Sequence, residues 1–332
     1  MKTAIVILNW NGKKLLEQFL PSIIKFSSNE AKIYVADNAS TDNSINYIKE
    51  YYPSIGILKN HNNVGYAKGY NDALIHIEAD VYCLINSDVE VTENWLPPIL
   101  DVFKNEKNTA IIQPKILDFK NKTKFEYAGA GGGFLDLYGY PYCRGRVFNR
   151  LETDNDQFND IKNIFWASGA CFFVRSKVFK QLAGFDEDYF AHQEEIDFCW
   201  RTKNIGYDVK YVGYSTVYHL GGGTLKETNP HKTFLNFRNS LLNIVKNVPR
   251  NWFLFVIFSR LTLDGVAGIK FFFELRPIHT WAIVRAHFSF YKNFFKFLNK
   301  RKKIKKNPNY NKHTSIVWQY FILGRKTFDE LK

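Results

Sequence analysis

Short apolar runs alternate with helical patterns through the first 110 residues, and this alternation restricts the fold more than any other feature. Residues 4–8, 32–36, 55–58 and 81–85 are predicted to be strands. Helices are predicted between them over 13–26, from 45 onward and over 65–77, with a break near Pro21. Because strand–helix–strand units of this length favour right-handed crossovers, the sequence predicts an α/β fold with a mostly parallel sheet flanked by helices.

Polar residues follow three of these predicted strands at the point where each strand ends. They are Asn9, Asp37 and the segment 86–88, which reads Asn-Ser-Asp. Ligands of open parallel sheets bind outside the carboxyl ends of the strands, so these residues are expected to share a site. An acid in this position can hold Mg²⁺ or Mn²⁺ against a diphosphate. For 86–88 taken alone, an Asx-rich turn is an equally good interpretation.

Three acids, Glu194, Glu195 and Asp197, fall within one predicted helical turn. Like charges in a cleft raise one pKa, which suits a general base. Alternatively, the acids oppose the helix dipole and pair with Arg201, four residues beyond Asp197. Taken alone, the pattern favours this second interpretation. His219, at the end of a predicted strand, fits either a metal ligand or a buried histidine, and taken alone it favours the buried histidine.

Several classes of protein are excluded by local pattern. The glycine-rich segment 129–133 lacks a preceding strand, a following helix and a Lys-Ser/Thr ending, so it is neither a phosphate loop nor a dinucleotide fingerprint. The four cysteines form no CxxC pair, which favours a reduced, cytosolic chain. No apolar run is long enough to span a bilayer, and no signal peptide is expected at the N-terminus.

One segment carries almost all of the basic charge. Of the formal net charge of +13, residues 246–306 contribute +12, with 14 Lys and Arg against Asp264 and Glu274, and they are rich in Phe and Trp. This combination favours the headgroup layer of an anionic membrane over an ordinary helical subdomain. A nucleic-acid surface is the least favoured reading, and no nucleic-acid partner is expected.

Together, these segments resemble the inverting glycosyltransferases of family 2, which share the fold called GT-A. The resemblance covers about residues 3–245. It rests on residues 7–12 (ILNWNG), 35–42 (VADNASTD), 60–67 (NHNNVGYA), 84–91 (LINSDVEV), 185–190 (FDEDYF) and 194–201 (EEIDFCWR). Asn86-Ser-Asp88 and the segment Ser168–Cys171 are most similar to the rhamnosyltransferase-like branch.

The resemblance implies a GT-A domain over 1–245, with a nucleotide-sugar half at about 1–110 and an acceptor half at about 111–245, followed by a helical membrane-surface region over 246–332. In the donor half, Asp37 is expected to accept a hydrogen bond from a uracil or thymine base, with Asn9 and Asn38 beside it. Lys68 is expected to neutralise the diphosphate.

The resemblance also assigns the metal and the base. Asp88 and His219 are the expected ligands of Mg²⁺ or Mn²⁺, and Asn86 stands where the family has another Asp. Glu195 stands where the family has its catalytic Asp, so it is the expected base. Glu194 and Asp197 are also expected to belong to the catalytic group. On the acceptor side, the expected residues are Trp166, Ser168 and Gly169.

The implied reaction moves a sugar, with rhamnose as the candidate, from a UDP- or dTDP-linked donor to a polyprenyl-diphosphate-linked glycan in bacterial surface polysaccharide synthesis. The basic, aromatic segment predicts a peripheral protein on the cytoplasmic face of the membrane. Two alternatives remain at this point: a UDP-hexose transferase with another acceptor, and an inactive nucleotide-sugar-binding or membrane scaffold protein.

Overall fold

The computed structural model describes residues 1–221, 229–301 and 309–332. Within these ranges, the main sheet runs in the order β11-β13-β6-β12-β4-β1-β2-β3, with β5 paired to β13. Its strands are β1 (Thr3–Asn9), β2 (Lys32–Asp37), β3 (Gly56–Lys59), β4 (Val81–Asn86), β5 (Val89–Val91), β6 (Thr109–Asp118), β11 (Ile161–Asn163), β12 (Cys171–Arg175) and β13 (Asp208–His219).

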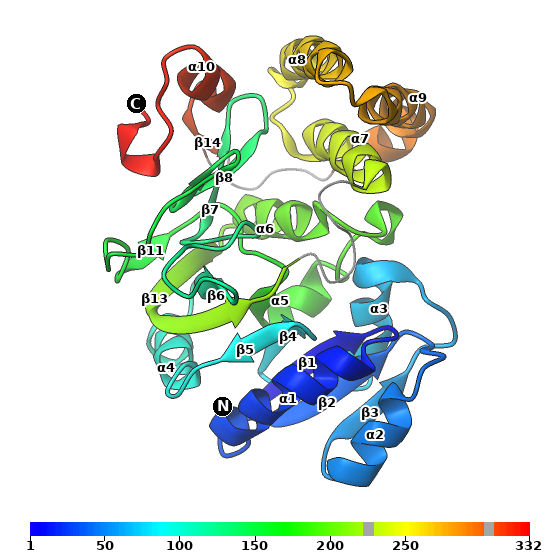
Figure 1. Cartoon of the computed structure of the whole chain (residues 1–332), viewed down its shortest axis with the longest axis vertical. Coiled ribbons are helices and arrows are strands. Elements are labelled where there is room, and N and C mark those ends of the chain that lie inside the picture. Colours follow the sequence, from blue (N-terminus) through cyan, green and yellow to red (C-terminus); the bar gives the residue numbers. More distant parts are fainter. Residues whose placement is uncertain (222–228, 302–308) are drawn as a thin grey trace.

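Four neighbouring strands are parallel, as predicted. β1 lies between β2 and β4, and β3 extends the same direction beyond β2 (Figure 1). Asn9 is aligned with Asp37, and Leu8 with Asn86. The polar residues at the strand ends therefore meet at one edge of the sheet. β12 runs antiparallel to β4, which makes the sheet mixed.

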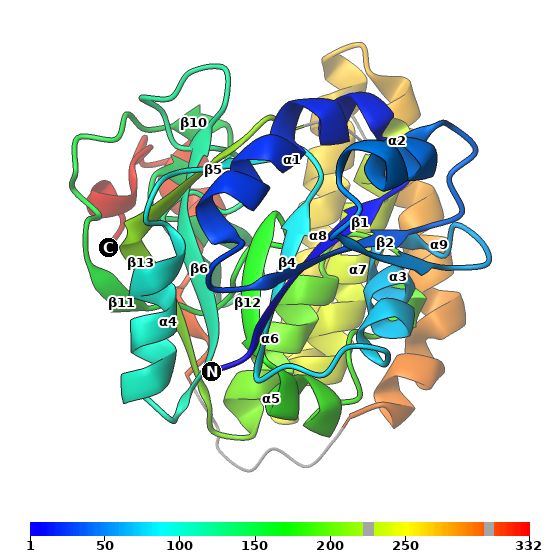
Figure 2. The ribbon, with the colours of Figure 1, turned by 90° about the horizontal axis from the view of Figure 1, so that it is seen from below.

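Helices cover both faces of this sheet (Figure 2). They include α1 (Lys13–Ser27), α2 (Ser44–Tyr51), α3 (Gly65–Leu74), α4 (Leu96–Asn105), α5 (Ser176–Gln181) and α6 (Glu194–Asn204). The side chains of β1 alternate between two apolar cores, with Ala4 and Val6 in one and Ile5 and Ile7 in the other. Burial on both faces explains why these strands are continuously apolar.

The predicted break at Pro21 is wrong, because α1 continues through it. The buried face of this helix, which includes Leu16, Phe19, Leu20 and Ile23, anchors the turns on both sides of the proline. Tertiary packing of that face outweighs the hydrogen bond that proline cannot donate.

A second, smaller sheet has the order β10-β9-β8-β7-β14. Its strands are β7 (Gly133–Asp136), β8 (Pro141–Cys143), β9 (Arg146–Val147), β10 (Arg150–Leu151) and β14 (Asn311–His313). Because β14 pairs with β7, the C-terminal segment returns to the middle of the chain. Two short 3₁₀ helices, η1 (Glu187–Tyr189) and η2 (Phe328–Glu330), complete the irregular parts.

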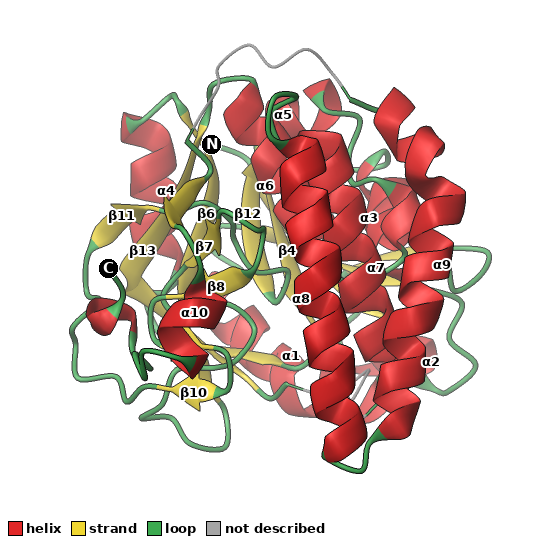
Figure 3. Cartoon of the chain, turned by 90° about the horizontal axis from the view of Figure 1, so that it is seen from above, coloured by secondary structure: helices red, strands yellow, loops and turns green. Residues whose placement is uncertain are grey.

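The C-terminal region begins with α7 (Pro230–Asn247), α8 (Phe253–Phe273) and α9 (Pro277–Asn299), followed by α10 (Ile316–Phe321). Helices α8 and α9 form a long hairpin beside α7 (Figure 3). The expected domain boundary at 245/246 falls inside α7, which also contacts α6. Among the described residues, no helix is both long enough and apolar enough to cross a membrane.

Candidate active site

Asn9 and Asp37 lie side by side at the carboxyl ends of β1 and β2, both buried. The Asn9 Nδ2 donates to Asp37 Oδ1 at 3.0 Å and to Ser40 Oγ at 3.1 Å. Asp37 Oδ2 accepts from the backbone N–H of Ser40 at 3.0 Å. The loop after β2 thus fixes the Asp37 carboxylate, as recognition of a base N–H requires.

Asn38 and Lys68 are engaged within the protein. Asn38 Nδ2 donates to the carbonyl of Gly65, and its Oδ1 accepts from Asn60 Nδ2, so its amide joins the end of β2 to the start of α3. The Lys68 ammonium lies 2.9 Å from Asp72 Oδ1. A diphosphate would have to compete with this exposed ion pair, which is weak in water.

Asp88 meets His219 where β5 pairs with the end of β13. His219 Nε2 lies 3.2 Å from Asp88 Oδ1, and His219 Nδ1 lies 3.3 Å from Glu126 Oε2. Burial would lower the pKa of His219, but the two carboxylates raise it to about 10. Asp88 and Glu126 lie 131 and 93 positions before His219 in the sequence, and the fold brings all three residues into one buried cluster.

Asp88 and His219 could together bind a divalent cation that takes its remaining oxygens from a substrate, once the cation displaces the proton from His219 Nε2. Mg²⁺ and similar ions are usually bound through one or two protein ligands together with substrate phosphates. In residues 1–221, 229–301 and 309–332, no group of three or more His, Cys, Asp or Glu could hold a metal ion by itself. The side chains thus fit a metal bound jointly with a diphosphate, and not a protein-only metal centre.

Glu194 and Glu195 open helix α6, and their environment separates them from ordinary surface acids. Burial, together with the neighbouring Glu195, raises the pKa of Glu194 well above its usual range. Burial raises the pKa of Glu195 to about 7. The buried Oε2 atom of each has no hydrogen-bond partner among the described residues. A carboxylate with this pKa and a free oxygen can accept a proton at neutral pH.

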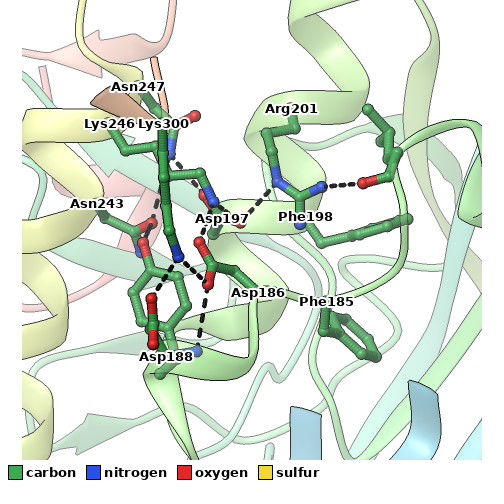
Figure 4. Close-up of polar contacts among 12 residues, drawn as sticks. Phe185, Asp186, Asp188, Asp197, Phe198, Arg201, Asn243, Lys246, Asn247 and Lys300 are labelled. Carbon is green, nitrogen blue, oxygen red and sulfur yellow. Dashed lines mark hydrogen bonds and ion pairs between the residues drawn. The ribbon is translucent and has the colours of Figure 1, made fainter. Parts of the chain in front are cut away.

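Asp197 has a different environment, which Figure 4 shows. Its carboxylate lies 2.7 Å from Arg201 Nε and 2.9 Å from Lys246 Nζ, and it also accepts from Asn247 Nδ2. Burial would raise the pKa of Asp197, but Arg201 and Lys246 hold it below its usual value. The expected pair with Arg201 is confirmed. The expected catalytic role of Asp197 stays a prediction, and the structure places its carboxylate inside an ion network.

The segment 166–170 connects the neighbourhood of Asp88 with that of Glu194 and Glu195. The backbone N–H of Asn86 donates to the Ala170 carbonyl at 3.0 Å, and the Gly169 carbonyl accepts from the Tyr66 hydroxyl at 2.9 Å. Burial, with contributions that include Glu194 and Glu195, raises the pKa of Tyr66. This segment therefore links the strand before Asp88 to a tyrosine close to both glutamates.

Two of the expected acceptor-side side chains already have partners within the protein. Trp166 Nε1 donates to the carbonyl of Phe134 at 2.9 Å, and Ser168 Oγ accepts from the backbone N–H of Ala170 at 3.1 Å. The polar atoms of Trp166, Ser168 and Gly169 that these bonds use are therefore engaged within the protein.

Sequence patterns gave no sign of Glu126 or Tyr66. Glu126 follows no predicted strand. Tyr66 lies between Gly65 and Ala67, and neither neighbour marks it as a site residue. Only the pairing of β13 with β5 brings His219 to Asp88, with Glu126 beside it, and only the fold brings Tyr66 to Gly169.

The basic segment is partly neutralised by acids of the protein itself. Of its fourteen basic residues, Lys302, Lys303, Lys305 and Lys306 lie outside the described residues. Five of the other ten pair with carboxylates, namely Lys246, Arg260, Lys270, Lys296 and Lys300. The positive charge available to a membrane is therefore smaller than the sequence count suggests.

Residues 4–183 match the family described as Glycosyl transferase family 2. The chain is 24% identical to the N-acetylglucosaminyl-diphospho-decaprenol L-rhamnosyltransferase of Mycobacterium tuberculosis over 235 residues, which cover 65% of this chain and 75% of that protein. This similarity agrees with the resemblance to the rhamnosyltransferase-like branch.

Two solved structures confirm the GT-A type of fold. Staphylococcus aureus TarS 1–349, in complex with UDP-GlcNAc, has a TM-score of 0.56 and 13% identity, covering 94% of this chain and 97% of that one. GalNAc-T7 with UDP, GalNAc and Mn²⁺ has a TM-score of 0.56 and 16% identity, covering 74% of this chain. The present chain spans 47% of the length of GalNAc-T7.

Proposed function

The chain belongs to glycosyl transferase family 2, and from this premise we propose that it transfers a sugar from a nucleoside-diphosphate donor to a hydroxyl of a lipid-linked glycan, with inversion at the anomeric carbon. The single observation that carries the proposal is that the fold provides two distinct groups of ionisable side chains. Asp88 and His219 form one group, while Glu195, with a pKa near 7 and an unpaired buried oxygen, forms the other.

In the proposed reaction, Glu195 removes the proton of the acceptor hydroxyl as that oxygen attacks the anomeric carbon. Attack from the face opposite the diphosphate inverts the centre, so no enzyme nucleophile is needed. Asp37 fixes the base of the donor through N–H recognition. Asp88 and His219 would hold a divalent ion such as Mn²⁺ or Mg²⁺, which would offset the charge of the leaving diphosphate.

The lipid-linked acceptor is supported by the C-terminal helices. An apolar surface covers the outside of α8 and α9, and it includes Phe258, Phe273 and Phe288, which are 73%, 78% and 68% exposed. Other exposed members are Leu254, Phe255, Ile269, Phe272, Leu275, Ile278, Trp281, Tyr291 and Phe295. So many large apolar side chains exposed on one pair of helices are typical of an interaction surface.

The position of this surface supports a membrane partner. The α8–α9 turn lies at the end of the molecule toward which β1 and β4 point (Figures 2 and 3). Thr233 at the start of α7 also contacts His279 at the start of α9. Helices lying in a membrane surface would thus bring the site to an acceptor whose lipid chain is buried in the same membrane. We therefore propose a peripheral protein on the cytoplasmic face of a bacterial membrane.

The relative from Mycobacterium tuberculosis is named for a decaprenol-linked acceptor and for rhamnose, and TarS was solved with UDP-GlcNAc. These names support a polyprenyl-diphosphate glycan as acceptor and either a dTDP- or a UDP-sugar as donor. A UDP-hexose transferase with another acceptor is the second candidate, favoured by the UDP-bound structures.

Release of nucleoside diphosphate tests the activity. Candidate dTDP- and UDP-sugars are incubated with the full chain, Mn²⁺ or Mg²⁺, and a short polyprenyl-diphosphate glycan. Acceptor-dependent release supports the proposal, whereas donor binding without release with any acceptor identifies an inactive binding protein.

Liposome flotation tests the membrane surface. The full chain is expected to float with vesicles that contain anionic lipid, and the double variant Phe258→Glu/Phe288→Glu is expected to stay at the bottom. Tyr51→Glu, which changes an exposed aromatic residue on α2, is the matched control and should float like the unchanged chain. Failure of the unchanged chain to float at low salt would contradict membrane association.

A further inference from the structure

The loop that leads into the two glutamates has an unfavourable backbone. Phe190, His192 and Gln193 have φ values of 65°, 67° and 74°, and none of them is glycine. A residue held in this left-handed region is strained and persists only when its surroundings hold it there. Three such residues in four positions immediately before Glu194 therefore require a strong external support.

Helix α7 provides that support through two buried asparagines. Asn239 and Asn243 are four residues apart, so they lie on the same face of the helix. Asn239 Nδ2 lies 3.1, 3.0 and 2.7 Å from the carbonyl oxygens of Tyr189, Ala191 and His192. The carbonyls of the strained loop thus converge on a single amide nitrogen.

Asn243 continues the support to the start of α6. Its Nδ2 donates to the Gln193 carbonyl at 3.1 Å, and its Oδ1 accepts from the Tyr189 hydroxyl at 2.8 Å. Asn239 is 0% exposed and Asn243 is 2% exposed, so water cannot readily replace either amide. Buried hydrogen bonds of this kind are costly to lose, because the carbonyls would remain unpaired.

The opposite side of the loop faces the donor half of the protein. The Phe190 carbonyl accepts from the backbone N–H of Tyr66 at 2.9 Å, and Tyr66 donates its hydroxyl to Gly169. A shift of the loop would therefore move Tyr66 and the two glutamates together. Errors of about 1 Å in such groups cost up to about a hundredfold in rate.

A second set of contacts anchors the segment just before this loop to α7, to α9 and to Lys300 immediately after α9 (Figure 4). Lys246 Nζ lies 2.7 Å from Asp186, while Lys300 Nζ contacts both Asp186 and Asp188 at 2.6 and 2.5 Å. Lys296 adds a further pair with Asp188 at 2.7 Å. The C-terminal region thus holds the loop by its carbonyls and the segment before it by the side chains of Asp186 and Asp188.

We propose that Asn239 and Asn243 are positioning residues that hold the 190–193 loop in its strained form, and thereby set the orientation of Glu194 and Glu195 toward the acceptor. This inference rests on the proposed function, since it concerns the carboxylates that would serve that reaction. It places part of the active site in a helix outside the matched residues 4–183.

The test compares Asn239→Ala and the milder Asn239→Ser with Asn236→Ala. Asn236 lies on the same helix, and no hydrogen bond joins its side chain to the loop among the described residues. For Asn239→Ala, kcat should fall about 10- to 100-fold while donor affinity stays within about threefold. Asn239→Ser keeps one hydrogen-bond donor, so its kcat should lie between that of Asn239→Ala and that of the unchanged chain. Asn236→Ala should match the unchanged chain.

Amide hydrogen exchange supplies a readout that does not depend on turnover. The N–H groups of residues 190–195 should exchange at least about tenfold faster in Asn239→Ala, whereas those of β1 and β4 should not change. Equal exchange in Asn239→Ala and Asn236→Ala would overturn the proposed support of the loop. Faster exchange with unchanged kcat would overturn its role in orienting the glutamates.

The two levels of inference fail in different ways. Absence of nucleoside diphosphate release from the unchanged chain, with every donor and acceptor, counts against the proposed function before any variant is made. Release from the unchanged chain, together with equal kcat in both alanine variants, counts against the positioning role alone.

Discussion

Replacement of Glu195 by glutamine should stabilise the protein at alkaline pH while it removes activity. Glutamine keeps the shape of the side chain but carries no charge and cannot accept the proton. The pKa of Glu195 rises from its ordinary value of 4.5 to about 7 through burial. A folded-state pKa that is raised means that the folded protein binds this proton more tightly than the unfolded chain does.

The sign of the pH effect follows from this difference. Below about pH 4.5, the carboxyl group is protonated in both states and costs nothing. Between about pH 4.5 and 7, the unchanged protein loses stability, because the carboxyl group ionises in the unfolded chain while the folded protein still holds it protonated. The loss approaches about 3 kcal/mol, since each of the roughly 2.5 pKa units corresponds to about 1.36 kcal/mol. Glu195→Gln avoids this loss.

Thermal unfolding measures the difference. Unfolding entropy of about 2.1 cal/mol/K per residue gives about 0.7 kcal/mol/K for a chain of 332 residues, so Glu195→Gln should raise Tm by about 4 °C at pH 8. The rise should vanish at pH 4.5. Glu78→Gln, which changes an exposed acid on the surface, is the control and should shift Tm by less than about 1 °C at both values.

Transfer by Glu195→Gln should fall about 10²- to 10⁴-fold in kcat, with donor affinity unchanged. For the unchanged enzyme, kcat should rise with pH through about 7, because the base must lose its proton. If the Tm difference between Glu195→Gln and the unchanged chain did not depend on pH, the raised pKa of Glu195 would be refuted. Full turnover in Glu195→Gln together with an inactive Glu194→Gln would move the base to Glu194.

Three further predictions concern the proposed metal ligand Asp88, the ion network around Asp197 and the packing of Gly133 against Trp166. Asp88→Ala should lower Mn²⁺-dependent donor affinity to its metal-free level in titration calorimetry and abolish transfer; unchanged turnover would remove Asp88 from the mechanism. Lys246→Met leaves Asp186 and Asp197 without a shared buried cation and should cost about 3–5 kcal/mol in urea unfolding, whereas a cost below about 1 kcal/mol would mean that the network is solvated. Gly133→Ala would place a methyl carbon 2.1 Å from the Trp166 ring and should lower Tm by several degrees, and an unchanged Tm would show that the ring can move aside.

The sequence by itself determined the parallel part of the sheet and the place of the donor-side residues. Continuous apolar runs predict strands buried on both faces, and the end of each run marks the carboxyl edge where Asn9, Asp37 and Asp88 lie. The order of the motifs also identified the family. These features are local, because strand periodicity and strand ends are written within a few residues.

Tertiary structure decided how the acids divide into roles. Glu195 and Asp197 are two residues apart in one helical turn, yet burial raises one pKa while Arg201 and Lys246 lower the other. Lys246 lies 49 positions from Asp197, within a segment whose charge pattern indicated only a surface. Counting charges along the sequence cannot show which lysines form ion pairs with carboxylates inside the protein.

The supports of the site were likewise beyond the reach of sequence patterns. Asn239 and Asn243 belong to a helix whose amphipathic pattern predicts packing but not its partner, and the loop that they hold lies about 50 positions earlier in the chain. Glu126 reaches His219 only because β13 crosses back along β6 to β5. Local patterns fix where the chain forms strands and helices, whereas the environment of a carboxylate depends on distant groups that only the folded chain brings within hydrogen-bonding distance.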